Sequence, residues 1–305
     1  MEADPGRIAS LHAAWETHQG YVRERNEDLA CLVRLREHHA IAAAVLDGLG
    51  GHGGGDVAAR IGAHEFRRAW RTPLPSDPMG RYEWMLSAFY AAHDAIRRYG
   101  ARTLGLGGMG ATAAAVLATP EGCLLMHAGD CRVYHFRRGQ LQYVTADHTI
   151  VRILLEKGHI TEDQVATHPM RSVVTSCLGG GSEARLSVDP KWEDGGGPAF
   201  RSLSPGDTIL LCSDGLWSEV SQERLSTLVA QFSGKPRLLA KACKQAALDA
   251  GAHDNVTVAA ICVRAKSHPR PARKITVRAE KPLNVYPGAA PSRDGSGIWR
   301  PGRLI

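Results

Sequence analysis

IAAAVLDGLGGHGGGD, residues 41–56, is the stretch that decides the fold, because an apolar run in it ends at a single carboxylate. Residues 41–46 are apolar and are followed by a glycine-rich segment, which predicts a buried strand. A helical pattern begins at about residue 57. Asp47 is therefore expected where a strand gives way to a glycine-rich loop, and such a loop lets the backbone approach an ion or a phosphate closely. The alternative for this stretch alone is an ordinary loop with an Asp turn.

Two other phosphate-related motifs fail on their context. Residues 48–53 match G-x-G-x-x-G, but no acidic residue follows about 20 residues on at the end of a second strand, as a dinucleotide site requires. Cys131 and Arg137 have the spacing of a cysteine-dependent phosphatase loop. Such a loop must curl around its phosphate, whereas residues 133–136 alternate like a strand. A Walker-type nucleotide motif is also absent from the sequence.

The composition indicates a protein of the reducing cytoplasm. The chain has 305 residues, of which 44% are apolar, enough for the core of one large domain. No apolar run approaches the length of a membrane span, and residues 1–6 carry acids where a signal peptide would be basic. The seven cysteines include no C-x-x-C pair, which is typical of small core residues. We expect a cytoplasmic monomer with no membrane association.

The positive charge is concentrated at the C-terminus. Residues 264–305 contain ten Lys or Arg and two acids, whereas the first 263 residues contain 27 basic and 29 acidic residues. The same segment holds six of the 16 prolines. We therefore predict a folded domain over residues 10–264 and a flexible basic tail over 265–305. A nucleic-acid-binding tail is the alternative and predicts salt-sensitive binding, but its basic residues lack interleaved aromatics, so we expect no nucleic acid.

Periodicity gives a coarse map of the remaining elements. Strands are predicted near residues 29–35, 41–46, 111–117, 123–127, 133–136, 141–144, 208–212 and 256–263, and helices near 57–70, 82–99, 222–230 and 236–250. Residues 147–165 also have a helical pattern, with Thr161 as a helix N-cap. The surrounding segment, about 148–190, is our candidate for a mobile flap that faces the substrate.

Four aspartates stand in turns at strand edges, each beside glycine or another small or polar residue: Asp47, Asp130, Asp214 and Asp254. Carboxylates brought together without a partner repel one another. Divalent cations resolve that repulsion, and an oxygen-only ligand set favours Mg²⁺ or Mn²⁺ over zinc. Two such ions about 4 Å apart activate a water and clamp an in-line displacement at phosphorus. If the aspartates converge, the expected chemistry is hydrolysis of a phosphate ester.

Six short motifs occur in the order found in the 2C-type metal-dependent protein phosphatases, which the chain resembles from about Gly20 to Val263. They are Arg23-x-x-Asn26-Glu27-Asp28, Asp47-Gly48 with Gly-Gly-His, Met109-Gly110-Ala111-Thr112, Gly129-Asp130-Cys131-Arg132, Ser213-Asp214-Gly215 and Asp254-Asn255. The loop DGLGGHGGG is similar to that of bacterial members. The resemblance implies an α+β fold, a four-layer α/β/β/α sandwich of two antiparallel sheets flanked by helices, with metal ions between the sheets at one edge.

The resemblance also implies an activity and a set of ligands. The activity is hydrolysis of phosphoserine and phosphothreonine on proteins, opposing a serine/threonine kinase, with two Mn²⁺ or Mg²⁺ ions. By this resemblance Asp47 bridges both ions, and the Gly48 carbonyl binds one of them. Asp214 and Asp254 complete the first ion's ligands, and Glu27 serves the second, directly or through water.

Further roles follow from the same resemblance. Arg23 would hold the substrate phosphate, as suits a guanidinium fork, and His52 would be the general acid for the leaving alkoxide. Asp130 would form a weaker third metal site with Asp214. Asp28, Asn255 and Thr112 are expected to support the ligands from behind without binding the ions themselves.

Two departures from the family pattern and one competing function remain. Ser218, followed by Glu219, stands where the family often has an acid near the third site, and Ala111 stands where a hydroxyl residue is common. The competing function is a non-catalytic scaffold or binding module on the same fold. Because every core metal acid is present, we favour the enzyme.

Overall fold

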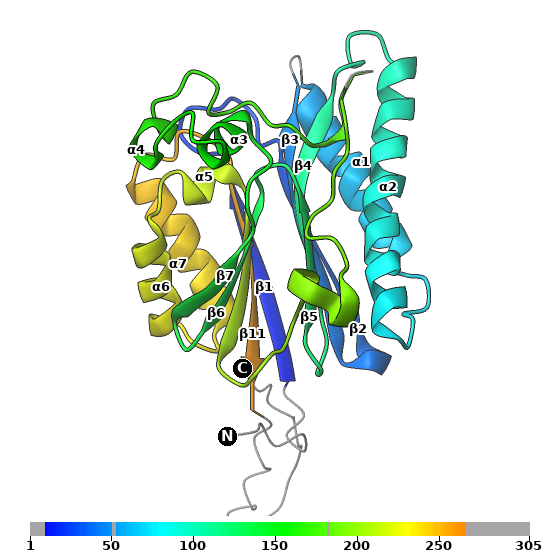
Figure 1. The fold of residues 1–305 in the computed structure, drawn as a ribbon, viewed down its shortest axis with the longest axis vertical. Coiled ribbons are helices and arrows are strands. Elements are labelled where there is room, and N and C mark those ends of the chain that lie inside the picture. Colours follow the sequence, from blue (N-terminus) through cyan, green and yellow to red (C-terminus); the bar gives the residue numbers. More distant parts are fainter. Residues whose placement is uncertain (1–9, 51–52, 182–183, 266–305) are drawn as a thin grey trace, which may run out of the picture. The chain divides into compact units, whose positions relative to one another are not determined.

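Two antiparallel sheets, packed face to face, form the centre of the computed structural model, which describes residues 10–50, 53–181 and 184–265 (Figure 1). In the described residues the first sheet has the order β1 (Ser10–His18), β11 (Val256–Arg264), β10 (Asp207–Cys212), β6 (Arg132–Arg137), β7 (Gln140–Val144). The second has the order β2 (Asp28–Leu35), β3 (Ala40–Leu49), β4 (Gly110–Ala118), β5 (Cys123–Ala128), β9 (Phe200–Arg201), with β8 (Leu178–Gly179) pairing to β4.

Helices cover the outer face of each sheet (Figure 1). The helices α1 (Gly54–Ala69) and α2 (Pro78–Arg102) lie on the second sheet, and α6 (Gln222–Gln231) and α7 (Pro236–Asp249) on the first. Shorter helices gather at one end of the sandwich: α3 (Ile150–Glu156), α4 (Glu162–Val165) and α5 (Asp214–Trp217). Two 3-10 turns, η1 (Arg36–His38) and η2 (Asp194–Ala199), complete the described elements. The four-layer α/β/β/α sandwich expected from the sequence is confirmed.

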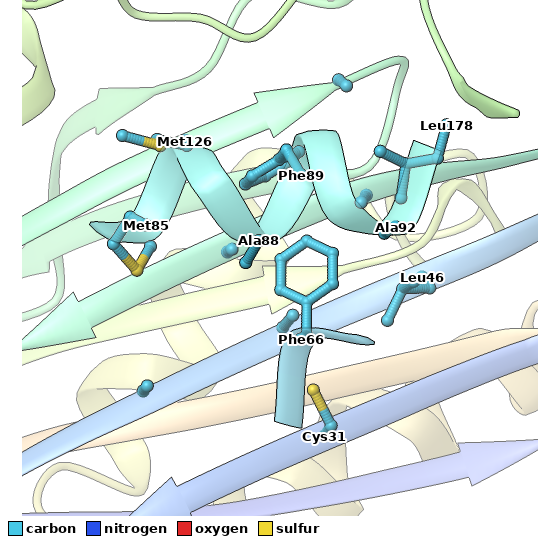
Figure 2. Packing of buried hydrophobic residues seen from close by; sticks show 14 of the residues in the cluster. Cys31, Leu46, Phe66, Met85, Ala88, Phe89, Ala92, Met126 and Leu178 are labelled. Carbon is cyan, nitrogen blue, oxygen red and sulfur yellow. The ribbon is translucent and has the colours of Figure 1, made fainter. Parts of the chain in front are cut away.

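The core explains why the strand at residues 41–46 is apolar at every position. The strand β3 is covered by helices on one face and by the other sheet on the opposite face, so both sets of its side chains are buried. On the helix side, Phe66 packs edge-on against Phe89 at a ring distance of 4.9 Å (Figure 2). Between the sheets lie small residues such as Ala43 and Ala114, which allow the two layers to approach closely.

Two expectations about local structure differ from the fold. The strand β1 was not predicted, because residues 10–18 do not alternate clearly and lie at a sheet edge where every residue keeps some exposure. The helical pattern at 147–165 forms two short helices rather than one, since Gly158 between them adopts a φ of +71°. Thr161 caps the second of these helices in a capping box, as predicted.

The described helices include none that is both long and apolar enough to cross a membrane. Two predictions fall outside the described residues. The predicted tail does so from position 266 onward, and His52 lies in the gap between residues 50 and 53.

Candidate functional site

Three of the predicted site residues form a row across the second sheet. Asp47 on β3 lies opposite Asp28 on one neighbouring strand and opposite Thr112 on the other. Asp47, near the end of β3, keeps some exposure, yet protein atoms surround its carboxyl group so closely that burial is the largest cause of its raised pKa. The negative charges of Asp28 and Asp214 raise that pKa further. Protonation or a cation is therefore needed to relieve the charge on this row.

Asp214 brings a carboxyl group from the other sheet to the same place. It follows β10 directly and is the first residue of α5, after the N-cap Ser213. Burial, followed by the charge of Asp254, raises the pKa of Asp214 to about 6, while a hydrogen bond with the Asp47 side chain opposes that rise. The two carboxyl groups therefore face each other closely enough for each to affect the pKa of the other. Within the described part of the chain, Asp214 Oδ1 is buried without a hydrogen-bond partner.

Asp28 connects the two sheets behind these carboxylates. Ser213 Oγ donates a 2.6 Å hydrogen bond to Asp28 Oδ2, and the same hydroxyl accepts from the Thr257 N–H at 3.0 Å. Burial, partly offset by the Ser213 hydrogen bond and reinforced by Asp214, raises the pKa of Asp28 to about 7. Its Oδ1 is also buried without a partner among the described residues. Asp28 therefore lies behind the carboxylates of Asp47 and Asp214, and its role in supporting metal ligands stays a prediction. Ser213, which belongs to one of the six motifs, is a hydrogen-bond partner to which the sequence analysis gave no role.

Asp254 is paired with the predicted phosphate-binding arginine. Arg23 Nη2 lies 2.6 Å from Asp254 Oδ2, and the hydrogen bond between them is the main cause of the raised pKa of Arg23. The Arg23 side chain remains 53% exposed. The guanidinium therefore lies at the rim of the carboxylate cluster and is accessible to a ligand from solvent.

Asn255 fixes the loop that carries Arg23 and Glu27. Its Oδ1 accepts from the Glu27 N–H at 2.7 Å, and its Nδ2 donates to the carbonyls of Gln19 and Arg25 at 2.7 and 2.8 Å. Asn255 is 5% exposed, so its own side of these part-buried bonds is shielded from water. Asn255 therefore holds, through three hydrogen bonds, a loop that lies more than 220 residues away in the chain.

Gly48 occupies a position with no room for a side chain. Its N–H donates to the Glu27 carbonyl at 3.2 Å, and a Cβ atom would lie 2.2 Å from the Gly55 carbonyl oxygen. This close approach positions the half-buried Glu27 beside Asp56. Burial and then the charge of Asp56 raise the pKa of Glu27, and the cations Arg23 and Arg25 oppose that rise.

Asp130 lies in the turn between β5 and β6, beside the main cluster. Burial and then the charges of Asp214 and Asp147 raise the pKa of Asp130 to about 7, whereas a hydrogen bond from Thr112 lowers it. The Trp217 Nε1–H donates to the Asp130 carbonyl at 2.9 Å. The turn is thereby fixed to α5, which begins at Asp214.

Arg132 and Asp147 support this turn; the sequence analysis named Arg132 only as part of a motif, gave it no role, and did not single out Asp147. The Arg132 guanidinium donates to both Asp147 carboxylate oxygens at 2.8 and 2.7 Å, and it lies 3.7 Å from the centre of the Trp217 ring. Two parallel hydrogen bonds fix both the distance between the Arg132 and Asp147 side chains and their relative orientation. Nothing local in the sequence distinguishes this pair from a surface ion pair, because the two residues are 15 positions apart.

The two departures from the family pattern have structural explanations. Glu219 accepts hydrogen bonds from the N–H and Nδ1 of His253, so it holds the loop next to Asp254. Ser218 is exposed at the end of α5. Ala111 is fully buried, and the adjacent Thr112 supplies the hydroxyl group that contacts Asp130.

The donor chemistry fits divalent cations. In the described ranges, no three or more His, Cys, Asp or Glu side chains form a ready-made cage for an ion. Asp47 and Asp214 nevertheless meet with raised pKa values, and the cluster leaves buried carboxylate oxygens unpartnered. The acceptors are oxygens, so hard cations such as Mg²⁺ and Mn²⁺ suit the site better than zinc.

Comparisons with known proteins agree with this geometry. Residues 21–248 match the family model described as protein phosphatase 2C. The serine/threonine phosphatase stp of Listeria welshimeri is 28% identical over 251 residues, which cover 81% of this chain and 94% of that protein. The serine/threonine protein phosphatase PstP of Mycobacterium tuberculosis is 32% identical over 81% of this chain and 44% of that protein. A solved structure of a PstP catalytic domain in complex with two manganese ions superposes with a TM-score of 0.69 and 28% identity, covering 84% of this chain and 99% of that one.

Proposed function

The chain belongs to the protein phosphatase 2C family and is a metal-dependent protein serine/threonine phosphatase, and we propose that its carboxylate cluster holds the metal ions of that reaction. The single observation that carries this assignment is the approach of Asp47 and Asp214 from opposite sheets, with unpartnered oxygens and like charges around them. Mn²⁺ and Mg²⁺ are the cofactors of the family, and the site offers them oxygen ligands.

Each predicted ligand has a distinct place in this proposal. Asp47, near the end of β3, would be a ligand shared by the two ions, and the Gly48 carbonyl would be a ligand of one of them. Asp214 and Asp254 complete the first ion's ligands, and Glu27 serves the second. Asp130, together with Asp214, forms a weaker third site. Bound divalent ions supply Lewis acidity, which activates water as a nucleophile at neutral pH and neutralises charge on the phosphoryl group.

The chain's own residues bind and orient the substrate. Arg23 extends into solvent from a loop that Asn255 holds rigid, so its guanidinium is placed to bind two phosphate oxygens. A turn of the guanidinium from Asp254 towards a phosphate would free Asp254 Oδ2 to act as a ligand. We retain His52 as the proposed general acid for the leaving serine or threonine oxygen.

We also propose a cytoplasmic monomer that opposes a cognate kinase by dephosphorylating its protein substrates. All seven cysteines are free, which suits a reducing compartment. The first 263 residues carry a slight negative charge and show no nucleic-acid-binding motif.

A peptide assay tests the proposed function. The purified chain is treated with a chelator and then assayed on phosphothreonine and phosphotyrosine peptides, with and without added Mn²⁺. We expect hydrolysis of the phosphothreonine peptide only when Mn²⁺ is present, and little hydrolysis of the phosphotyrosine peptide. Full turnover in chelator would contradict the proposed metal site.

A further inference from the structure

Gly129, immediately before Asp130, is bound at both of its backbone polar groups by histidines. Its N–H donates to His148 Nδ1 at 3.3 Å, and its carbonyl accepts from the His148 N–H at 2.9 Å. His127 Nδ1 lies 3.3 Å from the same carbonyl. Gly129 has a φ of +94°, and a Cβ atom there would lie 2.3 Å from Thr112 Cγ2. The backbone that orients Asp130 is therefore fixed on three sides.

His148 also connects this turn to the end of the 148–190 segment. Its Nε2 lies 3.1 Å from Asp189 Oδ2, and the same oxygen accepts from Ser187 Oγ at 2.9 Å. Asp189 pairs through its backbone with His127, with N···O distances of 2.8 and 3.0 Å. The two ends of the segment are thus joined to each other and to the Asp130 turn.

The hydrogen bonds define the state of the His148 ring. Because the Gly129 N–H can only donate, Nδ1 must be unprotonated, and Nε2 carries the proton that faces Asp189. His148 is mostly buried, with 15% of its side chain exposed, and its ring lies 4.3 Å from that of His127 at a tilt of 36°. Burial lowers the pKa of His148, although Asp189 opposes that change, which agrees with a neutral ring.

The segment held by His148 borders a large cavity. The cavity has a volume of about 620 Å³ and is lined by His127, His148, Ser187, Asp189 and Lys191 among others. His148 is the first residue of the 148–190 segment and is bonded to Gly129 in the Asp130 turn. A displacement of the segment would therefore move the Nδ1 atom that binds Gly129.

We propose that His148 is a positioning residue that sets the orientation of Asp130 through Gly129 and so couples the 148–190 segment to the weaker metal site. The inference rests on the proposed role of Asp130 as a ligand. His148 itself contacts neither the ions nor the substrate in this scheme. Its ring acts by accepting the Gly129 N–H. The effect of a substitution should therefore depend on whether the acceptor at the position of Nδ1 is kept, and not on the ion pair at Nε2.

Two variants separate the two ends of the ring. In His148→Asn the side-chain oxygen stands near the position of Nδ1 and still accepts from Gly129, but the contact with Asp189 is lost. In His148→Gln the terminal amide reaches towards Asp189, and the acceptor for Gly129 is lost. We expect His148→Gln to raise the Mn²⁺ concentration for half-maximal hydrolysis roughly three- to tenfold, the effect of one lost hydrogen bond. For His148→Asn the Mn²⁺ concentration for half-maximal hydrolysis should stay within about twofold of the wild-type value, because the hydrogen bond to Gly129 is kept.

Hydrogen exchange supplies a second readout that does not depend on activity. In chelated protein, the peptide covering residues 128–132 should exchange faster in His148→Gln than in His148→Asn, while α7 keeps its protection as a measure of intact fold. Equal behaviour of the two variants, or unfolding of both, would overturn the proposal in favour of a general structural role. A wild-type chain without Mn²⁺-dependent hydrolysis would instead refute the proposed function, and the exchange data would still decide the role of His148.

Discussion

Replacing Asp214 by Asn should abolish activity and at the same time stabilise the metal-free protein. The Asp214 carboxyl group is surrounded by Asp47 and Asp254, and burial with the charge of Asp254 raises its pKa to about 6. Asn keeps nearly the same shape but carries no charge, and its amide can donate to Asp47. The substitution removes a ligand and also removes part of the repulsion that the ligands impose on one another.

The size of the stabilisation follows from the raised pKa. An acid whose pKa is higher in the folded protein destabilises the fold when it is ionised. This cost is complete above about pH 6 and disappears below the ordinary pKa of 3.8. The rise from 3.8 to about 6 corresponds to ~3 kcal/mol at neutral pH, an upper value because neighbouring groups share the charge. For a domain of this size we expect Tm to increase by roughly 3–10 °C.

Thermal unfolding in chelator at pH 7.5 and at pH 4 measures this effect. The variant should be more stable than the wild type at the higher pH, and the difference should narrow at the lower pH. Hydrolysis at saturating Mn²⁺ should fall roughly 100-fold or more, as expected for loss of a ligand. Asp94→Asn, at an exposed position on α2, is the matched control and should change neither property. A metal-free Asp214→Asn that is less stable than the wild type at pH 7.5 would refute the reasoning about repulsion.

Three further substitutions test separate parts of the structure. Arg23→Lys should lower kcat/KM for a phosphothreonine peptide roughly tenfold, mainly through KM, because an ammonium group cannot bind two phosphate oxygens as a fork does; an unchanged KM would argue against phosphate binding by Arg23. Gly48→Ala should lower Tm by several degrees, roughly the effect of 2 kcal/mol, since its Cβ would lie 2.2 Å from a backbone oxygen; a wild-type melting curve would contradict that clash. Asp207→Asn should lose ~3 kcal/mol in urea unfolding at pH 7, because Asp207 is 1% exposed and bonded to His135 and Arg137. Burial alone would raise the pKa of Asp207, but these bonds lower it below its ordinary value. The stability that the bonds contribute is therefore present above the unfolded pKa and is lost as pH falls through the folded pKa. An equal urea midpoint for variant and wild type would show that the network contributes nothing.

The sequence predicted the layers of the fold because its strongest signals are local. The apolar run at residues 41–46 must be buried on both faces, and β3 is covered by helices on one face and by the first sheet on the other. The edge strand β1 gave no such signal, since one of its sides lacks a neighbour. Gly158 also ended a helical pattern that continues in sequence beyond it.

The site was predicted as a set of residues, whereas its geometry depends on distant partners. Asp47 stood out because it follows an apolar run and precedes glycines, although β3 continues past it to Leu49. Ser213 donates to Asp28 across 185 positions, and Asn255 clamps Glu27 across 228. Such contacts arise only when both sheets are packed, and no pattern along the chain reports them. The same holds for His148, whose partner Gly129 lies 19 positions earlier, in the turn between β5 and β6.

The location of Mn²⁺ ions in a crystal tests the central claim most directly. Anomalous diffraction from crystals grown with Mn²⁺ should show two peaks about 4 Å apart, with Asp47 in contact with both and with Asp214 and Asp254 bound to one of them. Peaks elsewhere on the molecule, or none within reach of these three carboxylates, would contradict the account.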